Sequence, residues 1–265
     1  MKLLIQEQHI PGESLVEKVP VAREWGFDGF ELRGKGDFHF ASRMEELRAA
    51  REAGGYFPTV CPEMPHFIGS FDADLRADAV TQLCSMLDVV AELGGRGVMT
   101  PASWGMFSKR LPPFTPPRDA DGDHEALFDG FSKVAAHAQA KGVEIYLEPL
   151  NRYEDHMINK LGDAAALVRE VGNPAFKVVC DTYHMNIEER DPLKALEEIL
   201  PELGHVQLSD SNRFEPGAGH VDFASIINLL TSTGYEGGLA FEHQLSGAAS
   251  EVLPQSAAFI RGLLP

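Results

Sequence analysis

The sequence predicts a (β/α)₈ barrel. Its 265 residues match the length of such barrels, which is typically about 250 residues. Short apolar segments alternate with amphipathic helical ones, and one unit recurs: a helix, a glycine near its end, a short apolar strand and then a polar residue. The unit is seen at 23–32, 91–100, 140–148, 171–181 and 234–242. Strands that alternate with helices pair in parallel, so we expect one barrel domain over 1–265.

Eight strands are expected, near 2–6, 28–32, 57–61, 96–100, 143–148, 176–181, 204–208 and 238–242. Glycine just past a helix end is the favoured left-handed cap, which explains its place before the strands. The structural alternative is an open, doubly wound sheet. Eight βα units favour the closed barrel, and the sequence has no Gly-x-Gly-x-x-Gly turn that would support the alternative.

The helices between these strands show a period near 3.6 residues. One is marked by Leu75, Ala79, Leu83, Leu87 and Val90, and another by Leu127, Phe131, Val134 and Ala138. Pro- and Gly-rich stretches at 101–123 and 210–220 predict long loops. They follow expected strands, so we place them on the face where barrel enzymes carry their active sites.

Composition excludes several classes of protein. With 44% hydrophobic and 24% charged residues the chain is globular, and no run of about 18 apolar residues predicts a membrane span. The N-terminus is interpreted as a first strand rather than a signal peptide. Three cysteines without a CxxC spacing favour a reducing cytoplasm, and argue against a disulfide framework or a zinc–cysteine site.

The formal net charge of −17 comes from 23 basic and 40 acidic residues. Such a surface repels phosphate backbones, so we predict no nucleic-acid partner. The same field disfavours an anionic substrate, although a local pocket can overrule it.

Oxygen-bearing side chains stand at the ends of four expected strands. The strand at 143–148 ends at Glu148, and Asp181, Gln207 and Glu242 end three others. A carboxylate at the end of a buried strand is costly unless a cation or hydrogen-bond donors await it. The carboxyl ends of barrel strands converge on one mouth, so we expect the four side chains to meet. The alternative is that these acids are bound to loop backbone.

The predicted cofactor is a divalent metal ion. Three carboxylates brought together repel one another unless a cation neutralises them. The ligands would all be oxygen atoms, because Gln207 offers its amide carbonyl. Hard ligands of this kind favour Mn²⁺ or Mg²⁺, with Co²⁺ as a substitute, over tetrahedral Zn²⁺.

Polar residues follow the predicted ligands at short offsets. Glu154, His184 and Arg213 are predicted to contact the hydroxyl groups of a bound polyol. Trp104 and Phe107, after the fourth strand, wall a sugar site or close the barrel mouth.

Residues of the first half are chemically quieter. His66 reaches the substrate or is an ordinary loop histidine, and Glu31 and Glu63 are interpreted as acids that support the site or the structure.

Three motifs resemble those of the xylose isomerase-like barrel superfamily: LEPLNRYE at 147–154, CDTYHMNIEE at 180–189, and HVQLSDSNR at 205–213 with PGAGHVDF at 216–223. Within it, the sequence is most similar to the D-tagatose/D-psicose (ketose) 3-epimerases and the hydroxypyruvate isomerases. The resemblance covers roughly 143–243 and is only architectural before that. Ketose epimerases usually have histidine where Gln207 stands, whereas hydroxypyruvate isomerases can carry glutamine.

The resemblance implies Glu148, Asp181, Gln207 and Glu242 as metal ligands, the two glutamates as the acid/base pair, and Glu154, His184 and Arg213 as substrate-binding residues. The implied activity is a ketose 3-epimerase acting through a metal-stabilised cis-enediolate on a small sugar or hydroxy-keto substrate. The predicted assembly is a homodimer or homotetramer.

Other functions remain open at this point. A hydroxypyruvate or an aldose–ketose isomerase uses the same kind of intermediate. An abasic-site endonuclease of the same superfamily needs several histidine ligands and a basic face, and neither is found in the sequence. A metal-free carbohydrate-binding barrel is disfavoured by the presence of all four ligand-type residues.

Overall fold

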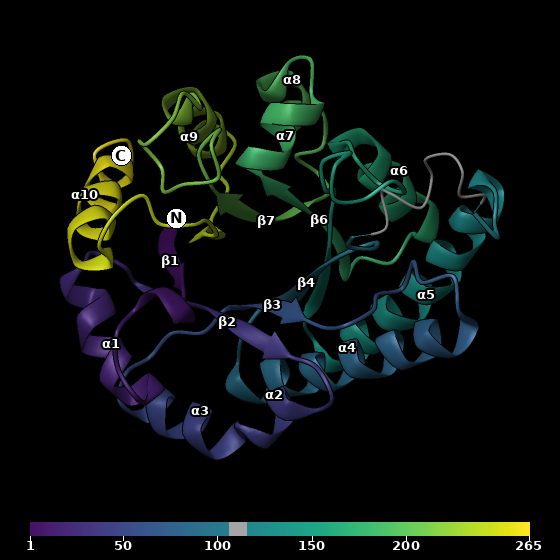
Figure 1. Cartoon of the computed structure of the whole chain (residues 1–265), viewed down its shortest axis with the longest axis horizontal. Coiled ribbons are helices and arrows are strands. Elements are labelled where there is room, and N and C mark those ends of the chain that lie inside the picture. Colours follow the sequence, from purple (N-terminus) through teal and green to yellow (C-terminus); the bar gives the residue numbers. More distant parts are fainter. Residues whose placement is uncertain (106–115) are drawn as a thin grey trace.

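In the computed structural model, which describes residues 1–105 and 116–265, eight parallel strands close into a barrel in sequence order, from β1 to β8 (Figure 1). The strands are β1 Lys2–Gln6, β2 Gly29–Lys35, β3 Thr59–Glu63, β4 Gly97–Pro101, β5 Glu144–Glu148, β6 Phe176–Asp181, β7 Leu203–Leu208 and β8 Gly238–Phe241. The predicted fold class and the eight expected strands are confirmed.

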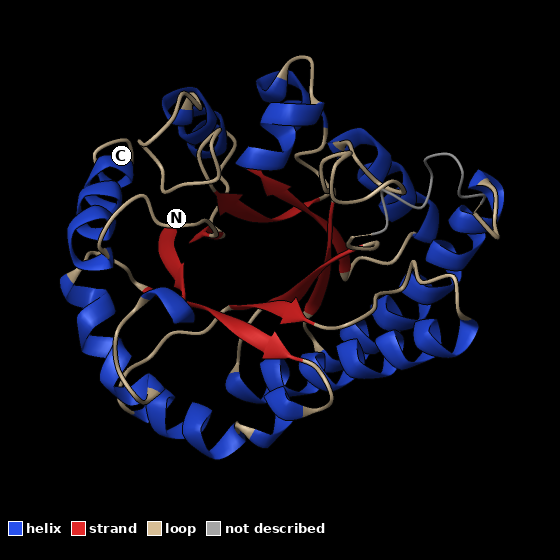
Figure 2. Ribbon diagram, viewed as in Figure 1, coloured by secondary structure: helices blue, strands red, loops and turns tan. Residues whose placement is uncertain are grey.

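Helices surround the strands, as Figure 2 shows by the blue ring outside the red barrel. The helices are α1 Leu15–Glu24, α2 His39–Ser42, α3 Met44–Glu52, α4 Ala73–Leu93, α5 Ala120–Lys141, α6 Leu161–Val171, α7 Thr182–Glu188, α8 Pro192–Glu198, α9 Phe223–Ser232 and α10 Ala249–Arg261, with the short 3-10 helix η1 at Glu7–His9. The two helices predicted from periodicity are α4 and α5. The short helices α7 and α8, which both lie between β6 and β7, were not predicted.

The ends of the long helices follow from their sequences. Asp72 caps α4 because its side chain accepts hydrogen bonds from the first free backbone N–H groups, and Asp119 does the same for α5. Gly94 and Gly142 end these helices in the left-handed conformation, with φ of 65° and 72°. Glycine adopts this conformation without steric cost, so each chain reversal brings the following strand back to the barrel.

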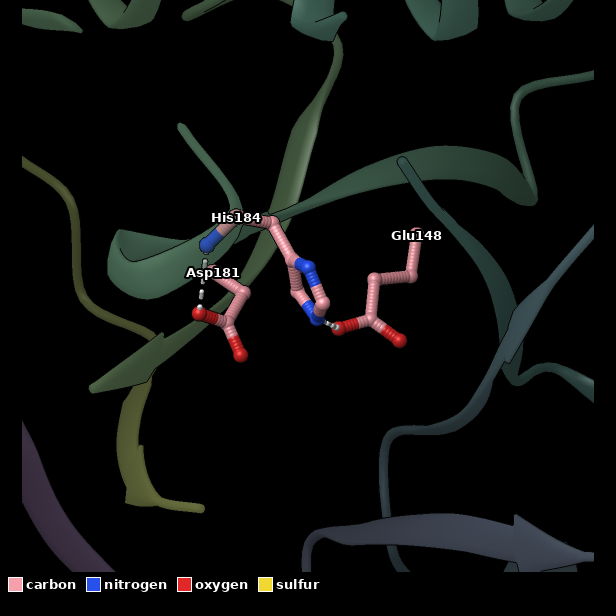
Figure 3. Close-up of side chains that lie close together, drawn as sticks. All are labelled: Glu148, Asp181 and His184. Carbon is pink, nitrogen blue, oxygen red and sulfur yellow. Dashed lines mark hydrogen bonds and ion pairs between the residues drawn. The ribbon is translucent and has the colours of Figure 1, made fainter. Parts of the chain in front are cut away.

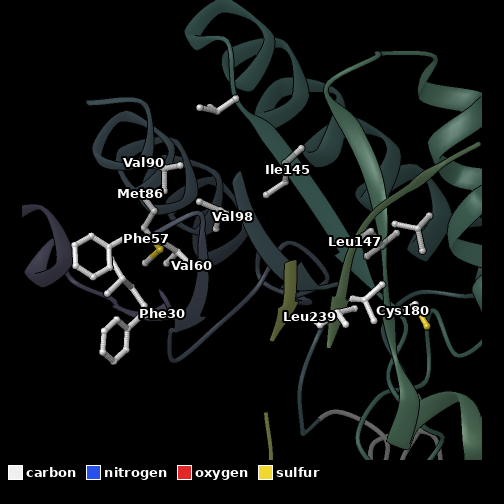
Figure 4. Close-up of a cluster of buried hydrophobic side chains, with 14 of the residues drawn as sticks. Phe30, Phe57, Val60, Met86, Val90, Val98, Ile145, Leu147, Cys180 and Leu239 are labelled. Carbon is white, nitrogen blue, oxygen red and sulfur yellow. The ribbon is translucent and has the colours of Figure 1, made fainter. Parts of the chain in front are cut away.

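The apolar core has two parts. The larger part lies between the strands and the helices, as seen in Figure 4 where Val60 of β3 and Val98 of β4 lie near Met86 of α4. The smaller part consists of Cys61, Met99, Tyr146 and Val179.

Tyr146 is fully buried in this smaller cluster, and glycines of β4 and β7 make room for its ring. A Cβ atom added at Gly204 would lie 2.5 Å from Cε1 of Tyr146, and one added at Gly97 would lie 2.7 Å from Cε2. Real Cβ contacts are not this short, so these strand positions require glycine. Met99 and Cys61 of the same cluster also line the cavity described below, so the tyrosine and its neighbours lie beneath that cavity.

Two strand boundaries differ from the prediction and matter for function. β2 continues to Lys35, which places Glu31 inside the strand and not at its end. β8 ends at Phe241, so Glu242 is the first residue after it.

Within the described residues, none of the helices combines the length and apolar character needed to cross a membrane. The three cysteines are all unpaired thiols.

Candidate metal and substrate site

A cavity of about 270 Å³ opens at the carboxyl ends of the strands. Its polar lining includes Glu148, Glu154, His184, Arg213 and Glu242. Apolar side chains from three neighbouring loops and strands form another part of its wall: Met64, Phe67, Met99 and Leu150. A pocket that combines an apolar wall with a few convergent polar groups is the usual form of a small-molecule site.

Glu148 and Asp181 are the last residues of β5 and β6. Asp181 is held rigidly, because its Oδ1 accepts hydrogen bonds from the backbone N–H groups of Tyr183 at 2.7 Å and His184 at 3.3 Å. Donor atoms of Glu148, Asp181 and His184 all lie within 4.8 Å of one another (Figure 3). The ends of β5 and β6 therefore bring two predicted ligands together, with His184 of α7 beside them.

Gln207 lies beside Asp181 in the register of β6 and β7 and is fully buried. Its Nε2 donates a hydrogen bond to Oε1 of Glu31 at 2.9 Å. Glu242, directly after β8, accepts a long hydrogen bond of 3.8 Å from the Cys61 thiol.

Three of the four predicted ligands each have a buried oxygen that makes no hydrogen bond: Oε1 of Glu148, Oε1 of Gln207 and Oε2 of Glu242. An unpaired buried acceptor costs about 1–3 kcal/mol, and more when it carries charge. A cation held by Glu148 and Asp181, whose donor atoms lie together, would reduce that cost. The residues therefore fit a hard divalent ion, which prefers oxygen ligands.

Several carboxylates lie close together in the site. Burial, followed by the charges of Glu242 and Asp181, raises the pKa of Glu148 well above its usual value. Burial is also the largest reason that the pKa of Glu242 is raised to about 7. Each shift reflects the difficulty of holding several carboxylates in a dry cavity. A bound divalent cation would reverse this effect and favour the ionised forms.

Arg213 supplies positive charge to the cavity. Its NH1 donates to Oδ2 of Asp181 at 2.7 Å, and its NH2 lies 3.4 Å from Oε2 of Glu242. Burial alone would raise the pKa of Asp181, but Arg213 and the backbone donors hold it below its usual value. The backbone of Arg213 is left-handed, with φ of 61°, a conformation uncommon for residues other than glycine.

His184 is fixed in one tautomer. Its Nδ1 accepts a hydrogen bond of 3.0 Å from the backbone N–H of Asn151, so the ring proton is on Nε2 when the ring is neutral. Burial lowers the pKa of His184 and favours that neutral form. Nε2 lies 3.7 Å from Oε1 of Glu148. The ring therefore presents an N–H donor at the ligand side, which suits contact with a substrate oxygen better than metal coordination.

Glu154 and Trp104 meet at the edge of the cavity, where the indole Nε1 donates to Oε2 of Glu154 at 3.3 Å. The other carboxylate oxygen of Glu154 accepts a hydrogen bond of 2.8 Å from the Asn151 side chain. Trp104 is 63% exposed and lines the cavity, so its ring is available to a ligand. Phe107 lies outside the described residues.

Two other residues named from the sequence contact partners of their own, although Glu63 also lines the cavity. Nε2 of His66 lies 2.6 Å from Oδ2 of Asp78 in α4, and His66 is not among the side chains that line the cavity. A direct substrate contact by His66 stays a prediction, and this interaction does not favour it. Glu63 is exposed and forms an ion pair of 3.2 Å with Arg33.

Sequence reasoning missed Arg33 and Asn151. Arg33 lines the cavity and stands two residues after Glu31 in β2, so strand alternation puts both on the same face. Asn151 lies within the motif at 147–154, but its contacts with His184 and Glu154 depend on loop geometry that spacing does not show.

Below the rim, His9 and His243 stack with ring centroids 5.2 Å apart. Burial is the main reason that the pKa of each is lowered from 6.5 to about 4. The unfolded chain takes up protons between pH 6.5 and about 4 while the folded protein does not. Folding stability therefore falls across this window as pH is lowered, by an amount on the order of 3 kcal/mol for each histidine.

His9→Phe keeps an aromatic ring against His243 and removes one of these groups. We expect the free energy of unfolding of this variant, measured by urea titration with a chelator present, to fall less between pH 7 and pH 4.5 than that of the wild type. His39→Asn, at an exposed position, is the matched control. An unchanged pH dependence in His9→Phe would contradict the prediction.

Comparison with known proteins agrees with the barrel fold described above. Residues 19–263 match the xylose isomerase-like TIM barrel family. A 3-dehydro-D-guloside 4-epimerase of Escherichia coli K12 is 39% identical over 246 residues, which cover 92% of this chain and 93% of that protein. A D-psicose 3-epimerase of Agrobacterium fabrum is 35% identical over 231 residues, covering 86% and 77%.

The crystal structure of a 3-keto-D-glucoside 4-epimerase from E. coli superposes with a TM-score of 0.93 at 38% identity, and covers 99% of both chains. The match thus extends over nearly the whole barrel, including the first half, where the sequence motifs gave no signal. The protein belongs to the xylose isomerase-like TIM barrel family.

Proposed function

We propose that the protein is a divalent-metal-dependent sugar epimerase that inverts a carbon next to a ketone. The observation that carries the proposal is that three predicted ligands, Glu148, Gln207 and Glu242, each hold a buried oxygen without a hydrogen bond, and that two of them, Glu148 and Glu242, line the cavity. The relatives named as sugar epimerases support the same reaction class.

Glu148, Asp181, Gln207 and Glu242 would hold the metal ion, for which we propose Mn²⁺ or Mg²⁺, with Co²⁺ as a substitute. When bound, the cation supplies positive charge beside the carbonyl and hydroxyl oxygens of the substrate, which makes the neighbouring C–H more acidic. The position of Asp181, fixed by two backbone N–H groups, gives the site a rigid anchor.

Epimerisation requires removal of a proton from one face of a carbon and its return from the other. Glu148 ends β5 and Glu242 follows β8, so the two carboxylates approach the cavity from separate parts of the barrel rim. In the proposed mechanism one takes the proton and forms an enediolate, and the other returns a proton to the opposite face. A well-placed acid or base of this kind contributes on the order of 10²–10⁴-fold.

The other polar residues hold the substrate. The Nε2–H of His184 donates to a substrate oxygen, Glu154 accepts from a hydroxyl, and Arg213 provides positive charge near the developing enediolate. Trp104 covers the open side of the cavity. These roles agree with the groups that each residue presents to the cavity.

The position of the reacting carbon is a finer proposal. We propose a ketose 3-epimerase. The 39% identical relative named a 4-epimerase favours a second candidate, in which the ketone is at carbon 3 and carbon 4 is inverted. A hydroxypyruvate isomerase or an aldose–ketose isomerase would use the same enediolate but return the proton to the adjacent carbon.

Incubation of the metal-loaded protein with a panel of ketoses and 3-keto glycosides in deuterated water tests the proposal. We expect deuterium at one carbon next to the ketone, together with the epimer at that carbon, read by NMR. Deuterium at the former carbonyl carbon of a new aldose would indicate an isomerase. Absence of exchange with every member of the panel would contradict the proposed function.

A cytoplasmic location is proposed from the unpaired thiols, which suit a reducing compartment. A homodimer or homotetramer stays a prediction that light scattering of the purified protein checks.

A further inference from the structure

Glu31 is a charged side chain with no exposure to solvent, located inside the barrel on β2. Each of its oxygens accepts two hydrogen bonds. Oε1 accepts from Nε2 of Gln6 at 3.1 Å and Nε2 of Gln207 at 2.9 Å. Oε2 accepts from Oγ1 of Thr59 at 3.1 Å and Nε2 of His205 at 2.8 Å. Four donors saturate a carboxylate, so Glu31 acts only as an acceptor.

This arrangement decides how the Gln207 amide is oriented. An amide can rotate by half a turn and exchange its oxygen and nitrogen. Rotation of Gln207 would place its carbonyl oxygen against the acceptor Oε1 of Glu31, and two acceptors in contact repel. The NH₂ group therefore faces Glu31, and the carbonyl oxygen is left buried without a hydrogen bond.

The unpaired carbonyl oxygen belongs to the site and not to the barrel floor. Gln207 lies beside Asp181 in the β6–β7 register, and neighbouring residues of parallel strands present their side chains to the same face.

We propose that Glu31 is a positioning residue of the metal centre, which holds the carbonyl oxygen of Gln207 toward the cation by accepting the amide N–H on the opposite side. The inference rests on the proposed metal-dependent function. It adds a residue from the first half of the barrel, on β2, to a centre whose four ligands all come from the second half. The hydrogen bond also polarises the amide, because a negative charge on the NH₂ side increases the negative charge on its oxygen.

Glu31→Gln is the main test, because it keeps the volume of the side chain and removes its charge. The readout is Mn²⁺ affinity of the metal-free protein, measured by titration with detection of free Mn²⁺ by electron paramagnetic resonance and without any sugar. We expect the dissociation constant to increase by about 10–100-fold, the usual effect of removing a hydrogen-bond partner of a metal ligand.

Thr59→Val is the matched control. It has nearly the same shape and removes a donor from Oε2 of Glu31, the oxygen that does not contact Gln207. We expect its Mn²⁺ affinity to stay within about threefold of the wild type. If Thr59→Val weakens binding as strongly as Glu31→Gln, general loosening of the buried network explains the effect and the inference is wrong.

A double-mutant cycle separates positioning from a purely structural role. If Glu31 acts through the amide, Glu31→Gln adds no further loss of Mn²⁺ affinity once Gln207→Ala has removed that amide. Equal losses in both backgrounds would overturn the inference. Should Glu31→Gln fail to fold, judged by circular dichroism, Glu31→Asp replaces it, since it keeps the charge but withdraws the acceptor from Gln207. We then expect a loss of about fivefold, again absent after Gln207→Ala.

The wild-type titration separates failure of the proposed metal-dependent function from failure of the positioning role of Glu31. A wild type that binds no Mn²⁺, Mg²⁺ or Co²⁺ contradicts the metal-dependent function itself. A wild type that binds Mn²⁺, with Glu31→Gln binding equally well, contradicts only the positioning role.

Discussion

Replacement of Glu148 or Glu242 by glutamine is expected to lower net epimerisation by about 10²–10⁴-fold, the contribution of one positioned acid or base. Glutamine keeps a ligand oxygen and nearly the same volume. The change therefore removes the proton-accepting group but leaves the shape of the site nearly unchanged. Each variant should still exchange the proton of the one epimer that its remaining glutamate can reach. In deuterated water, the two variants should therefore incorporate deuterium into opposite epimers without interconverting them.

Metal content must be measured for both variants, because each residue is also a predicted ligand. Glu125→Gln is a suitable control, since Glu125 is an exposed residue of α5 and does not line the cavity. Its turnover should stay near the wild-type value. If one glutamine variant loses all exchange with both epimers while the other only binds substrate more weakly, a single base acts from one face and the two-base mechanism is wrong.

Removal of the metal ion by a chelator is expected to abolish turnover. Without the cation, burial and the neighbouring carboxylates raise the pKa values of Glu148 and Glu242, which disfavours the ionised forms needed as bases, and the acidity of the substrate C–H is lost as well. Mn²⁺, Co²⁺ or Mg²⁺ should restore turnover better than Zn²⁺, because the ligands are hard oxygens. The assay is turnover of the metal-free protein after each ion is added back.

Gln207→His should shift the preference toward softer, nitrogen-accepting metal ions. Glu31 would remain available to accept the N–H of the introduced ring, as it does for His205. Full turnover of protein shown to be metal-free would contradict the metal's role in the reaction.

The sequence predicts several residues of this site because all strands of a parallel barrel end at the same mouth. Residues that end different strands in the sequence therefore lie near one another in the structure. Glu148, Asp181 and Glu242 were singled out as polar residues at the ends of apolar strands. The structure places the first two together and links Asp181 with Glu242 through Arg213. No information beyond strand order was needed for this grouping.

Other features depend on contacts that spacing does not reveal. The sequence predicts for Glu31 only an acid that supports the site or the structure, whereas the length of β2 and contacts across the barrel decide that it contacts Gln207. His66 lies on a loop near the mouth, yet Asp78, twelve residues later on α4, holds its ring. The left-handed backbone of Arg213 likewise has no signal in residue type, because glycine is the residue usually found in that conformation.

The order of the predicted ligands along the chain links cation binding to the folding of the second half of the barrel. Glu148, Asp181, Gln207 and Glu242 lie at the ends of β5 to β8, which pair in sequence order, so the four residues meet only when these strands have come together. A cation that binds this arrangement and not the open chain stabilises it by mass action, by about 2.7 kcal/mol at a concentration one hundred times its dissociation constant. The ion that serves chemistry at the mouth would thereby also hold together the last four strands of the barrel.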